Sequence, residues 1–293
     1  MSIPRILVTG ASGFLGGHLC RITAQEGEVV GAFHLHDSVP KDALAVQMDL
    51  QEEAALRKRL EEIDPHILVH AAVLQVDACE HNPELAERIN VQASRIIAEW
   101  CARRRRRLVY ISSDLVFDGA QGNYREIDAA QPVMIYGKTK LAAERAVLQA
   151  CASAAVARLP LLYGFPVAGG SNFFLSMLAR LQRGEVVPVF HDQYRTPGLV
   201  NNLAAAVWEL ACSDYRGIMH LAGATRCSRY EFARSVCHFA ALNEALLQPV
   251  SMFETPLLAP RPQDVSLDCS LANSVLHTRL LGVEKGLQLI LQF

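Results

Sequence analysis

Three glycines at three-residue intervals, Gly10, Gly13 and Gly16, constrain the fold of this chain more than any other feature of its sequence. They directly follow a β-branched run at residues 5–9 and open a stretch whose apolar residues have helical spacing, so we place them in a turn between a strand and a helix. In such a turn the glycines allow a tight bend, a close approach of pyrophosphate to the backbone, and close packing of helix on strand. The amide groups at the start of the helix favour negative charge. The turn therefore predicts a dinucleotide-binding site.

Strands and helices alternate along the chain after this turn. The predicted strands are residues 5–9, 28–33, 44–48, 67–72, 108–112 and 155–159. The predicted helices are residues 14–22, 54–62, 83–103 and 136–151. Strands that alternate with helices at this spacing imply βαβ crossovers and a parallel sheet that is covered on both faces. The sequence thus predicts an α/β fold of the Rossmann type, with a doubly wound parallel sheet.

The regular alternation ends after Gly164, where prolines and short helical patterns replace it. We expect a Rossmann domain at residues 1–164, to which a segment at about 198–222 returns with the last strand of the sheet, residues 217–221. Residues 165–197 and 223–293 are expected to form a smaller, discontinuous C-terminal lobe that binds substrate.

The composition excludes several classes of protein. The 28 basic side chains nearly balance the 30 acidic ones, for a formal net charge of −2, so no broad field would attract nucleic acid or an anionic membrane. No uninterrupted apolar run of about 18 residues occurs and no secretory signal opens the chain, so we expect a cytoplasmic protein. The five consecutive arginines at 103–107 are expected to face solvent and the C-terminal end of the long helix at 83–103, with a nucleic-acid or membrane patch as the alternative.

Cysteine and histidine spacing gives no metal motif. The eight cysteines are widely spread without a Cys-x-x-Cys pair, and we expect them to be reduced and mostly buried. His34 and His36 would need a third ligand to hold a metal ion, and none is evident. No metal is therefore expected.

Tyr136 and Lys140 lie four positions apart, which puts them on one face of a helix. A phenol needs cationic neighbours to exchange a proton near neutral pH, because its ordinary pKa is about 10. Ser113 lies at the end of a predicted strand, the edge at which open α/β sheets bind ligands. A serine hydroxyl there could bond a substrate carbonyl while the tyrosine supplies a proton.

These features in this order resemble the extended short-chain dehydrogenase/reductase family. Other marks of that family are Asp49 and Leu50 after the third strand, Ala71 and Ala72 at the end of the fourth, and Asn90 in the following helix. The resemblance implies that Ser113 polarises a carbonyl, that Tyr136 is the general acid, and that Lys140 lowers the Tyr136 pKa and holds the nicotinamide ribose. The hydride would come from the cofactor. The cofactor-binding residues that it implies are Gly10, Ser12, Gly13, Phe14, Leu15, Gly16, His34, Asp49, Leu50, Ala71, Ala72, Tyr136 and Lys140.

Within that family the chain resembles the dTDP-4-dehydrorhamnose reductases. The matching segments are residues 111–119, 192–193, 228–233 and 261–268. The implied activity is NAD(P)H-dependent reduction of a nucleotide-activated 4-keto-6-deoxysugar, and a nucleotide-sugar epimerase is a second alternative. Asn172, Arg195 and Arg261 lie where extended members hold a nucleotide diphosphate, and the loop at 124–126 could close over substrate.

The chain departs from the reductases at Leu115 and Leu161, where they usually carry aromatic residues. Both positions resemble the regulatory beta subunit of methionine adenosyltransferase, which leaves open a regulatory subunit that binds a partner enzyme. A homodimer is a further possibility. The second strand ends at His34 without an acid that would repel a 2'-phosphate, so NADP(H) is preferred and NAD(H) remains possible.

Overall fold

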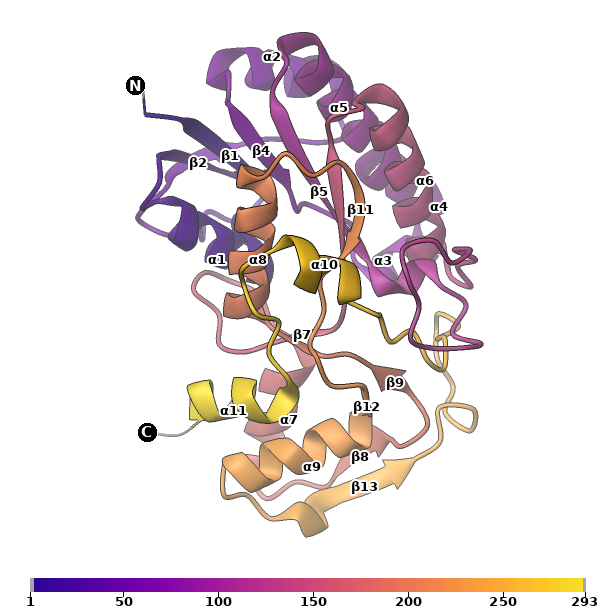
Figure 1. The fold of residues 1–293 in the computed structure, drawn as a ribbon. Helices are drawn as coiled ribbons and strands as arrows, with labels where there is room; N and C mark the ends of the chain where they lie inside the picture. Colours follow the sequence, from indigo (N-terminus) through magenta and orange to yellow (C-terminus); the bar gives the residue numbers. More distant parts are fainter. Residues whose placement is uncertain (1–2, 292–293) are drawn as a thin grey trace.

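The computed structural model of the chain describes residues 3–291 and contains a central seven-stranded sheet (Figure 1). Its strands lie in the order β11-β6-β5-β4-β1-β2-β3 and pair in parallel throughout. Their bounds are β1 Arg5–Thr9, β2 Glu28–Phe33, β3 Leu44–Gln47, β4 Ile67–His70, β5 Arg107–Ser113, β6 Ala155–Leu159 and β11 Gly217–His220. This order confirms the predicted doubly wound α/β fold, and its direction reverses between β1 and β4, the place where such sheets bind ligands.

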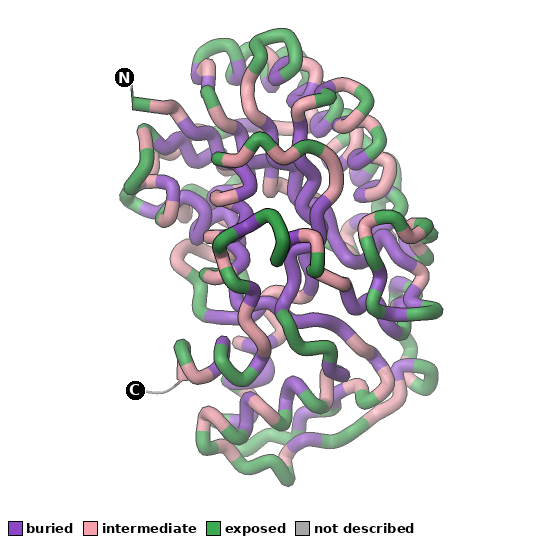
Figure 2. Tube along the Cα trace, viewed as in Figure 1, coloured by how far each residue is buried: buried purple, intermediate pink, exposed green. Residues whose placement is uncertain are grey.

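Helices cover both faces of the sheet. On one face pack α1 (Phe14–Thr23) and α8 (Val200–Cys212), and on the other α2 (Glu53–Ile63), α5 (Ala93–Arg104) and α6 (Ile135–Ala150). The strands between them are rich in β-branched and aliphatic residues and, apart from the edge strand β3, are largely buried (Figure 2). A parallel strand covered on both faces needs such a continuous apolar run, which is why the strands could be predicted closely.

The long helix predicted at 83–103 is divided in the structure. It begins as α4 (Pro83–Ala86), passes through a π-helical segment at Glu87–Gln92, and continues as α5. Asn90 lies in the π segment, where its side-chain oxygen accepts from the Leu74 amide at 2.8 Å and its nitrogen donates to Thr139 at 3.0 Å. Such a widened turn leaves a polar side chain free to bond outside the helix, and here it ties the helix to α6. A short helix that was not predicted, α3 (Val76–His81), precedes it.

The second half of the chain adds a third hydrophobic core below the sheet (Figure 1). Its helices are α7 (Phe173–Gln182), α9 (Arg229–Phe239) and α11 (Val283–Leu291), with α10 (Ser270–Val275) nearer the sheet. Its short strands are β7 (Leu162–Tyr163), β8 (Val187–Phe190), β9 (Tyr194–Arg195), β10 (Gly198–Leu199), β12 (Cys227–Ser228) and β13 (Leu247–Val250). They pair as β7 with β10, β8 with β13 and β9 with β12. The exact division into two domains stays a prediction.

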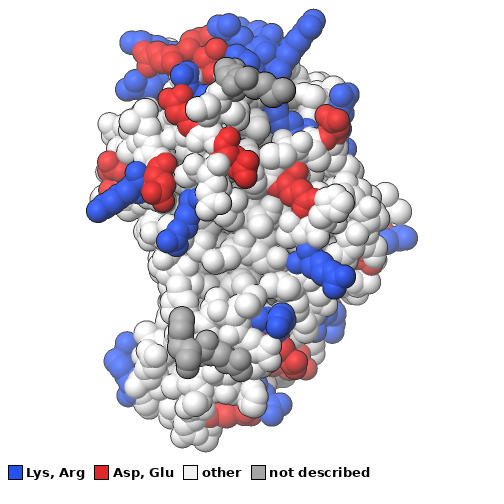
Figure 3. All heavy atoms as spheres, turned by 60° about the vertical axis from the view of Figure 1, so that its left-hand side comes forward, with Lys and Arg blue, Asp and Glu red and all other residues white. Residues whose placement is uncertain are grey.

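The last two arginines of the run at 103–107 contact segments that are distant in the sequence. Arg106 pairs with Asp64 at 2.9 Å, and Arg107 donates to the backbone carbonyls of Leu210 and Ala211 at the C-terminal end of α8. Basic and acidic side chains lie intermixed at the top of the molecule (Figure 3). Residues 103–105 face solvent as predicted, whereas the helix end that Arg107 contacts is that of α8 and not that of the long helix before the run.

Candidate functional site

The glycine turn packs directly against the end of β4. Gly10 has a φ of +72°, and a Cβ there would lie 2.8 Å from the Ala72 backbone. A Cβ on Gly16 would lie 2.0 Å from the Gly10 carbonyl oxygen. Only glycine fits either position. No side chain caps α1, whose N-cap residue is Gly13, and an uncapped helix N-terminus suits phosphate.

Buried polar groups fix the neighbouring strand ends. The Thr9 hydroxyl accepts from the Ala71 and Ala72 amides at 3.2 Å, so its proton is directed to His70 Nδ1 at 2.6 Å. His70 Nε2 then donates to Ser94 Oγ at 3.0 Å. Burial lowers the pKa of His70 to about 3, so this ring is neutral and acts as a structural link between β1, β4 and α5.

Two adjoining cavities run along the strand ends, and we call them together the strand-end cleft. The smaller, of about 230 Å³, lies beyond β1, β2 and β3. The larger, of about 510 Å³, reaches from the glycine turn past β5 and α6 to the lower lobe. Residues that line both cavities are Gly10, Gly13, Ala71, Val73 and Gln75. Their shared wall makes an elongated site at the switch point of the sheet.

Most of the predicted cofactor-binding residues lie in this cleft. Ser12, His34, Leu50 and Ala72 line the smaller cavity, and Phe14, Leu15, Gly16 and Tyr136 line the larger. Asp49 is set slightly apart: its carboxylate accepts from the Gln51 amide at 2.9 Å and lies 3.7 Å from His34 Nε2. The roles of these residues stay predictions.

Ser113, Asp114 and Tyr136 lie together in the wall of the larger cavity. Ser113 Oγ donates to Asp114 at 3.1 Å and accepts from the Leu115 amide at 3.2 Å. Burial, followed by the charge of Asp114, raises the pKa of Tyr136 well above its ordinary value, while a hydrogen bond with Ser113 opposes this. Burial thus favours the neutral phenol in the protein without cofactor, and a lowering of the Tyr136 pKa by Lys140 in the cofactor-bound site stays a prediction.

Lys140 lies one helical turn beyond Tyr136 and is buried. Its Nζ donates to the Ile111 carbonyl at 2.5 Å and lies 4.2 Å from the centre of the Tyr110 ring. Burial lowers its pKa to about 7, although the Glu144 carboxylate raises it. The amine is thus poised to change its charge near neutral pH.

Behind Lys140, a buried charged network joins α6 to the sheet. Glu144 accepts from Ser112 Oγ at 2.5 Å and from two nitrogens of Arg158 at 2.9 and 2.7 Å. Arg158 in turn donates to His220 Nε2 at 3.3 Å. Burial lowers the pKa of His220 to about 4. The network holds the Tyr136 helix at a fixed position against β5, β6 and β11.

The predicted substrate residues all line the larger cavity, but each has a partner within the protein. Asn172 caps α7 by accepting from the Leu175 amide at 2.9 Å. Arg195 pairs with Asp114 at 2.7 Å, and Arg261 pairs with Asp77 at 3.0 Å. Their roles in diphosphate binding stay predictions, and Arg195 also holds Asp114 in place.

Sequence reasoning missed Arg229, at the first position of α9. Its guanidinium lines the larger cavity, 4.3 Å from the centre of the Phe173 ring. It was included only as part of the matching segment 228–233, and no local pattern signals that its side chain reaches the cleft. The two departures from the reductases, Leu115 and Leu161, also line this cavity, so two positions of its wall are aliphatic where the reductases usually carry aromatic residues.

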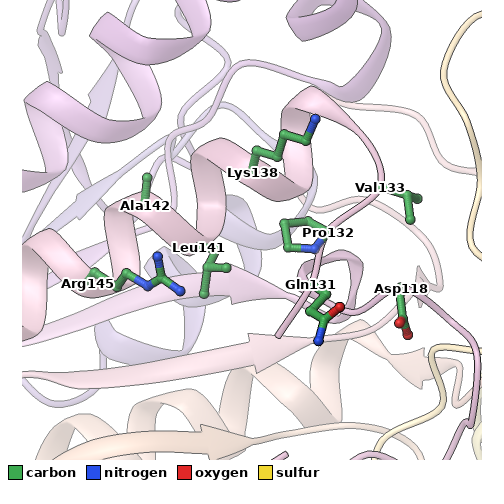
Figure 4. A pocket seen from close by; sticks show the side chains of 8 residues that line it. All are labelled: Asp118, Gln131, Pro132, Val133, Lys138, Leu141, Ala142 and Arg145. Atoms are coloured by element: carbon green, nitrogen blue, oxygen red, sulfur yellow. The ribbon is translucent and has the colours of Figure 1, made fainter. Parts of the chain in front are cut away.

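The loop at 124–126 does not line either cavity. The Tyr124 ring stacks on Phe117 at 4.1 Å, and its backbone pairs with Ser266 and Asp268. These contacts anchor the loop to the C-terminal segment in this structure, and a role in closing over substrate stays a prediction. A separate surface hollow lies near it, between residues 131–133 and the outward side of α6 that carries Lys138 and Arg145 (Figure 4). Tyr136 does not line that hollow.

Residues 3–291 contain no cluster of three or more His, Cys, Asp or Glu side chains able to hold a metal ion. None of the helices described there is both long and apolar enough to span a membrane.

The sheet order, the glycine turn and the strand-end cleft define an extended short-chain dehydrogenase/reductase. The chain belongs to the family of the RmlD substrate binding domain, whose model matches residues 4–292. It is 34% identical to methionine adenosyltransferase 2 subunit beta of Pongo abelii over 92% of this chain and 82% of that protein. It is 32% identical to the probable low-salt glycan biosynthesis reductase Agl14 of Haloferax volcanii, over 90% of this chain and 89% of that protein.

Solved structures give the same family assignment. A hypothetical dTDP-4-dehydrorhamnose reductase from Sulfolobus tokodaii matches with a TM-score of 0.86 and 32% identity, covering 96% of this chain and 98% of that one. The dTDP-4-dehydrorhamnose reductase from Bacillus anthracis, solved in complex with NADP, matches with a TM-score of 0.84 and 27% identity over 99% of both chains. MoeE5 in complex with UDP-glucose and NAD matches with a TM-score of 0.81 and 26% identity, covering 97% of this chain and 96% of that one. These matches confirm the resemblance inferred from the sequence.

Proposed function

We propose that this chain is an NAD(P)H-dependent reductase of a nucleotide-activated 4-keto-6-deoxysugar, of the dTDP-4-dehydrorhamnose reductase type. The observation that carries the proposal is the single cavity of about 510 Å³ whose wall contains the glycine turn, Ser113, Tyr136 and three arginines. A cofactor site, a proton donor and a site for anions are thus side by side, as reduction of a nucleotide sugar requires.

The residues present fit a nicotinamide dinucleotide. Gly10, Gly13 and Gly16 leave a cradle that a Cβ would fill, and the amides of Phe14 and Leu15 begin α1 beside it. The two adjoining cavities run in both directions from this cradle. When bound, the reduced nicotinamide supplies the hydride. His34 at the end of β2 favours NADP(H) over NAD(H) in this proposal.

The protein's own groups would handle the carbonyl oxygen. Ser113 Oγ is held by two hydrogen bonds at the end of β5 and would orient the substrate carbonyl. Tyr136 keeps its proton at neutral pH because burial raises its pKa, and it would donate that proton to the oxygen as negative charge develops there. Protonated Lys140 would stabilise the phenolate that remains, since its ammonium is the nearby cation on the same helix.

The test is an assay of NADPH oxidation with dTDP-4-dehydrorhamnose as substrate. We expect turnover by the natural protein, and a loss of about 10² to 10⁴-fold in Tyr136→Phe with unchanged NADPH affinity. Tyr215→Phe is the matched control, because its hydroxyl only bonds the Ile218 carbonyl at 2.7 Å. Full activity in Tyr136→Phe would refute the proton-donor role.

A second candidate is a cofactor-binding regulatory subunit. It is favoured by the 34% identity to methionine adenosyltransferase 2 subunit beta and by the aliphatic side chains of Leu115 and Leu161 in the cavity wall. A stoichiometric complex with a methionine adenosyltransferase, together with no turnover of any nucleotide sugar, would favour this role over the reductase. An epimerase would form product without net consumption of NADPH.

A further inference from the structure

Arg229 is held rigidly at the edge of the strand-end cleft. Ser228 and Glu231 form a capping box that fixes the start of α9, and the Arg229 amide donates to the Gln193 carbonyl at 3.0 Å. Its Nε donates to the Gln193 side chain at 3.0 Å, and the guanidinium lies 4.3 Å from the centre of the Phe173 ring. A guanidinium that is held by a hydrogen bond at Nε and by an aromatic ring against its face has little freedom to turn toward solvent.

Part of this guanidinium is left without a partner. Within residues 3–291, Arg229 Nη1 is buried and has no hydrogen-bond acceptor, and the same is true of Arg195 Nε. Buried donors are normally paired, and an unpaired one needs an explanation such as a ligand. Both arginines line the larger cavity, so an acceptor that enters the cavity is the simplest explanation for both.

The charges around the cavity are also unbalanced. Among the described residues, Asp114 pairs with Arg195 at 2.7 Å and Asp77 pairs with Arg261 at 3.0 Å, whereas Arg229 has no carboxylate partner. Burial lowers the pKa of Arg229 to about 9, and repulsion from Arg195 and Arg261 adds to this. The guanidinium is still charged at neutral pH, so it needs an anion from outside the chain.

We propose that Arg229 binds a phosphate oxygen of a nucleoside diphosphate, with Arg195 Nε as the second donor to the same diphosphate. This inference rests on the proposed function and specifies which side chain binds the nucleotide part of its substrate. A diphosphate has oxygens for two donors on separate elements, and the planar fork of arginine suits it. A single carboxylate offers fewer acceptor oxygens than a diphosphate for the two unpaired arginine nitrogens.

The test is isothermal titration calorimetry of dTDP, UDP and inorganic pyrophosphate into the NADPH-saturated protein. We expect Arg229→Gln to weaken dTDP and UDP at least tenfold and to weaken pyrophosphate as well, while NADPH affinity is unchanged. Arg229→Lys should lose less, because it keeps the charge. The matched control is Arg234→Gln on the same helix, because Arg234 is exposed and pairs with Glu244, and it should bind all ligands normally.

Other results would overturn the inference. One is unchanged dTDP affinity in Arg229→Gln, and another is an equal loss in Arg234→Gln. UDP-glucose and UDP-glucuronic acid are titrated in the same way. If Arg229→Gln loses affinity for UDP-glucuronic acid alone, with the affinities for UDP and UDP-glucose unchanged, then Arg229 binds a sugar carboxylate and not the diphosphate. Binding is measured without turnover, so a protein that binds dTDP through Arg229 but reduces no sugar would contradict the reductase and keep this inference. Thermal unfolding of each variant checks that the fold is retained.

Discussion

At the glycine-turn end of the strand-end cleft the wall is made of backbone, whereas at the α9 end it is made of charged side chains. Gly10, Gly13 and Gly16 are close in sequence and act by having no side chain. Asp114 and Arg195 are 81 residues apart, and Arg229 comes from yet another segment. The first end is therefore specified by the local sequence, whereas the second is specified only by the completed fold.

The largest effect is expected for Gly16→Ala at the glycine-turn end. A Cβ there would lie 2.0 Å from the Gly10 carbonyl oxygen and 2.6 Å from its carbon, and backbone atoms cannot rotate away. We expect a loss of unfolding free energy of about 3 kcal/mol or more and no measurable NADPH binding. Thermal unfolding and fluorescence titration with NADPH measure the two effects.

Gly184→Ala is the control for this substitution. Gly184 has a φ of +74° but nothing lies within 4 Å of a Cβ there, so only about 1 kcal/mol of backbone strain is expected. Equal losses in the two variants would show that the close approach within the turn has no special importance.

Glu144→Gln is expected to have the next largest effect, on stability. The change leaves buried Arg158 without its carboxylate partner, which should lower the unfolding free energy by about 3 kcal/mol. Chemical denaturation measures this. Glu99→Gln removes the partially exposed partner of Arg57 and Arg95 and should cost less than about 1 kcal/mol. If Glu144→Gln lowered the unfolding free energy as little as Glu99→Gln, the buried network would not hold α6 in place.

The pH dependence of turnover should follow Lys140. Its pKa of about 7 means that the ammonium is present at lower pH and is lost as the pH rises through 7, so kcat/KM should fall about tenfold per pH unit above that point. Tyr136 contributes no inflection there, because its raised pKa keeps it protonated. Lys140→Arg keeps a positive charge and should remove the inflection. A profile unchanged by that substitution would assign the inflection to another group.

The smallest effect is expected at His34, in the wall of the smaller cavity. His34→Asp places a negative charge where a 2'-phosphate is expected and should weaken NADPH about tenfold, a loss of about 1.4 kcal/mol. NADH affinity should be unchanged or improved. His36→Asp, two exposed positions further on, is the control. If NADH weakens as much as NADPH, then His34 does not select the cofactor.

The strands and the glycine turn could be predicted because their signals are local: continuous apolar runs and a fixed glycine spacing. The π segment around Asn90 could not, since it depends on bonds to Leu74 and Thr139 that only the fold brings near. For Tyr136, helical spacing indicated a cation on the same helix but gave no measure of burial, which raises the pKa of this phenol in the protein without cofactor. Arg229 was missed because its side chain reaches the cleft only after the lower lobe is assembled.

The most direct measurement follows deuterium from NADPH labelled at its transferable position, incubated with the protein and dTDP-4-dehydrorhamnose. The reductase account predicts that mass spectrometry finds the label on the former carbonyl carbon of the sugar, with the natural protein and not with Tyr136→Phe. A protein that binds labelled NADPH yet transfers no deuterium to the sugar would contradict the account.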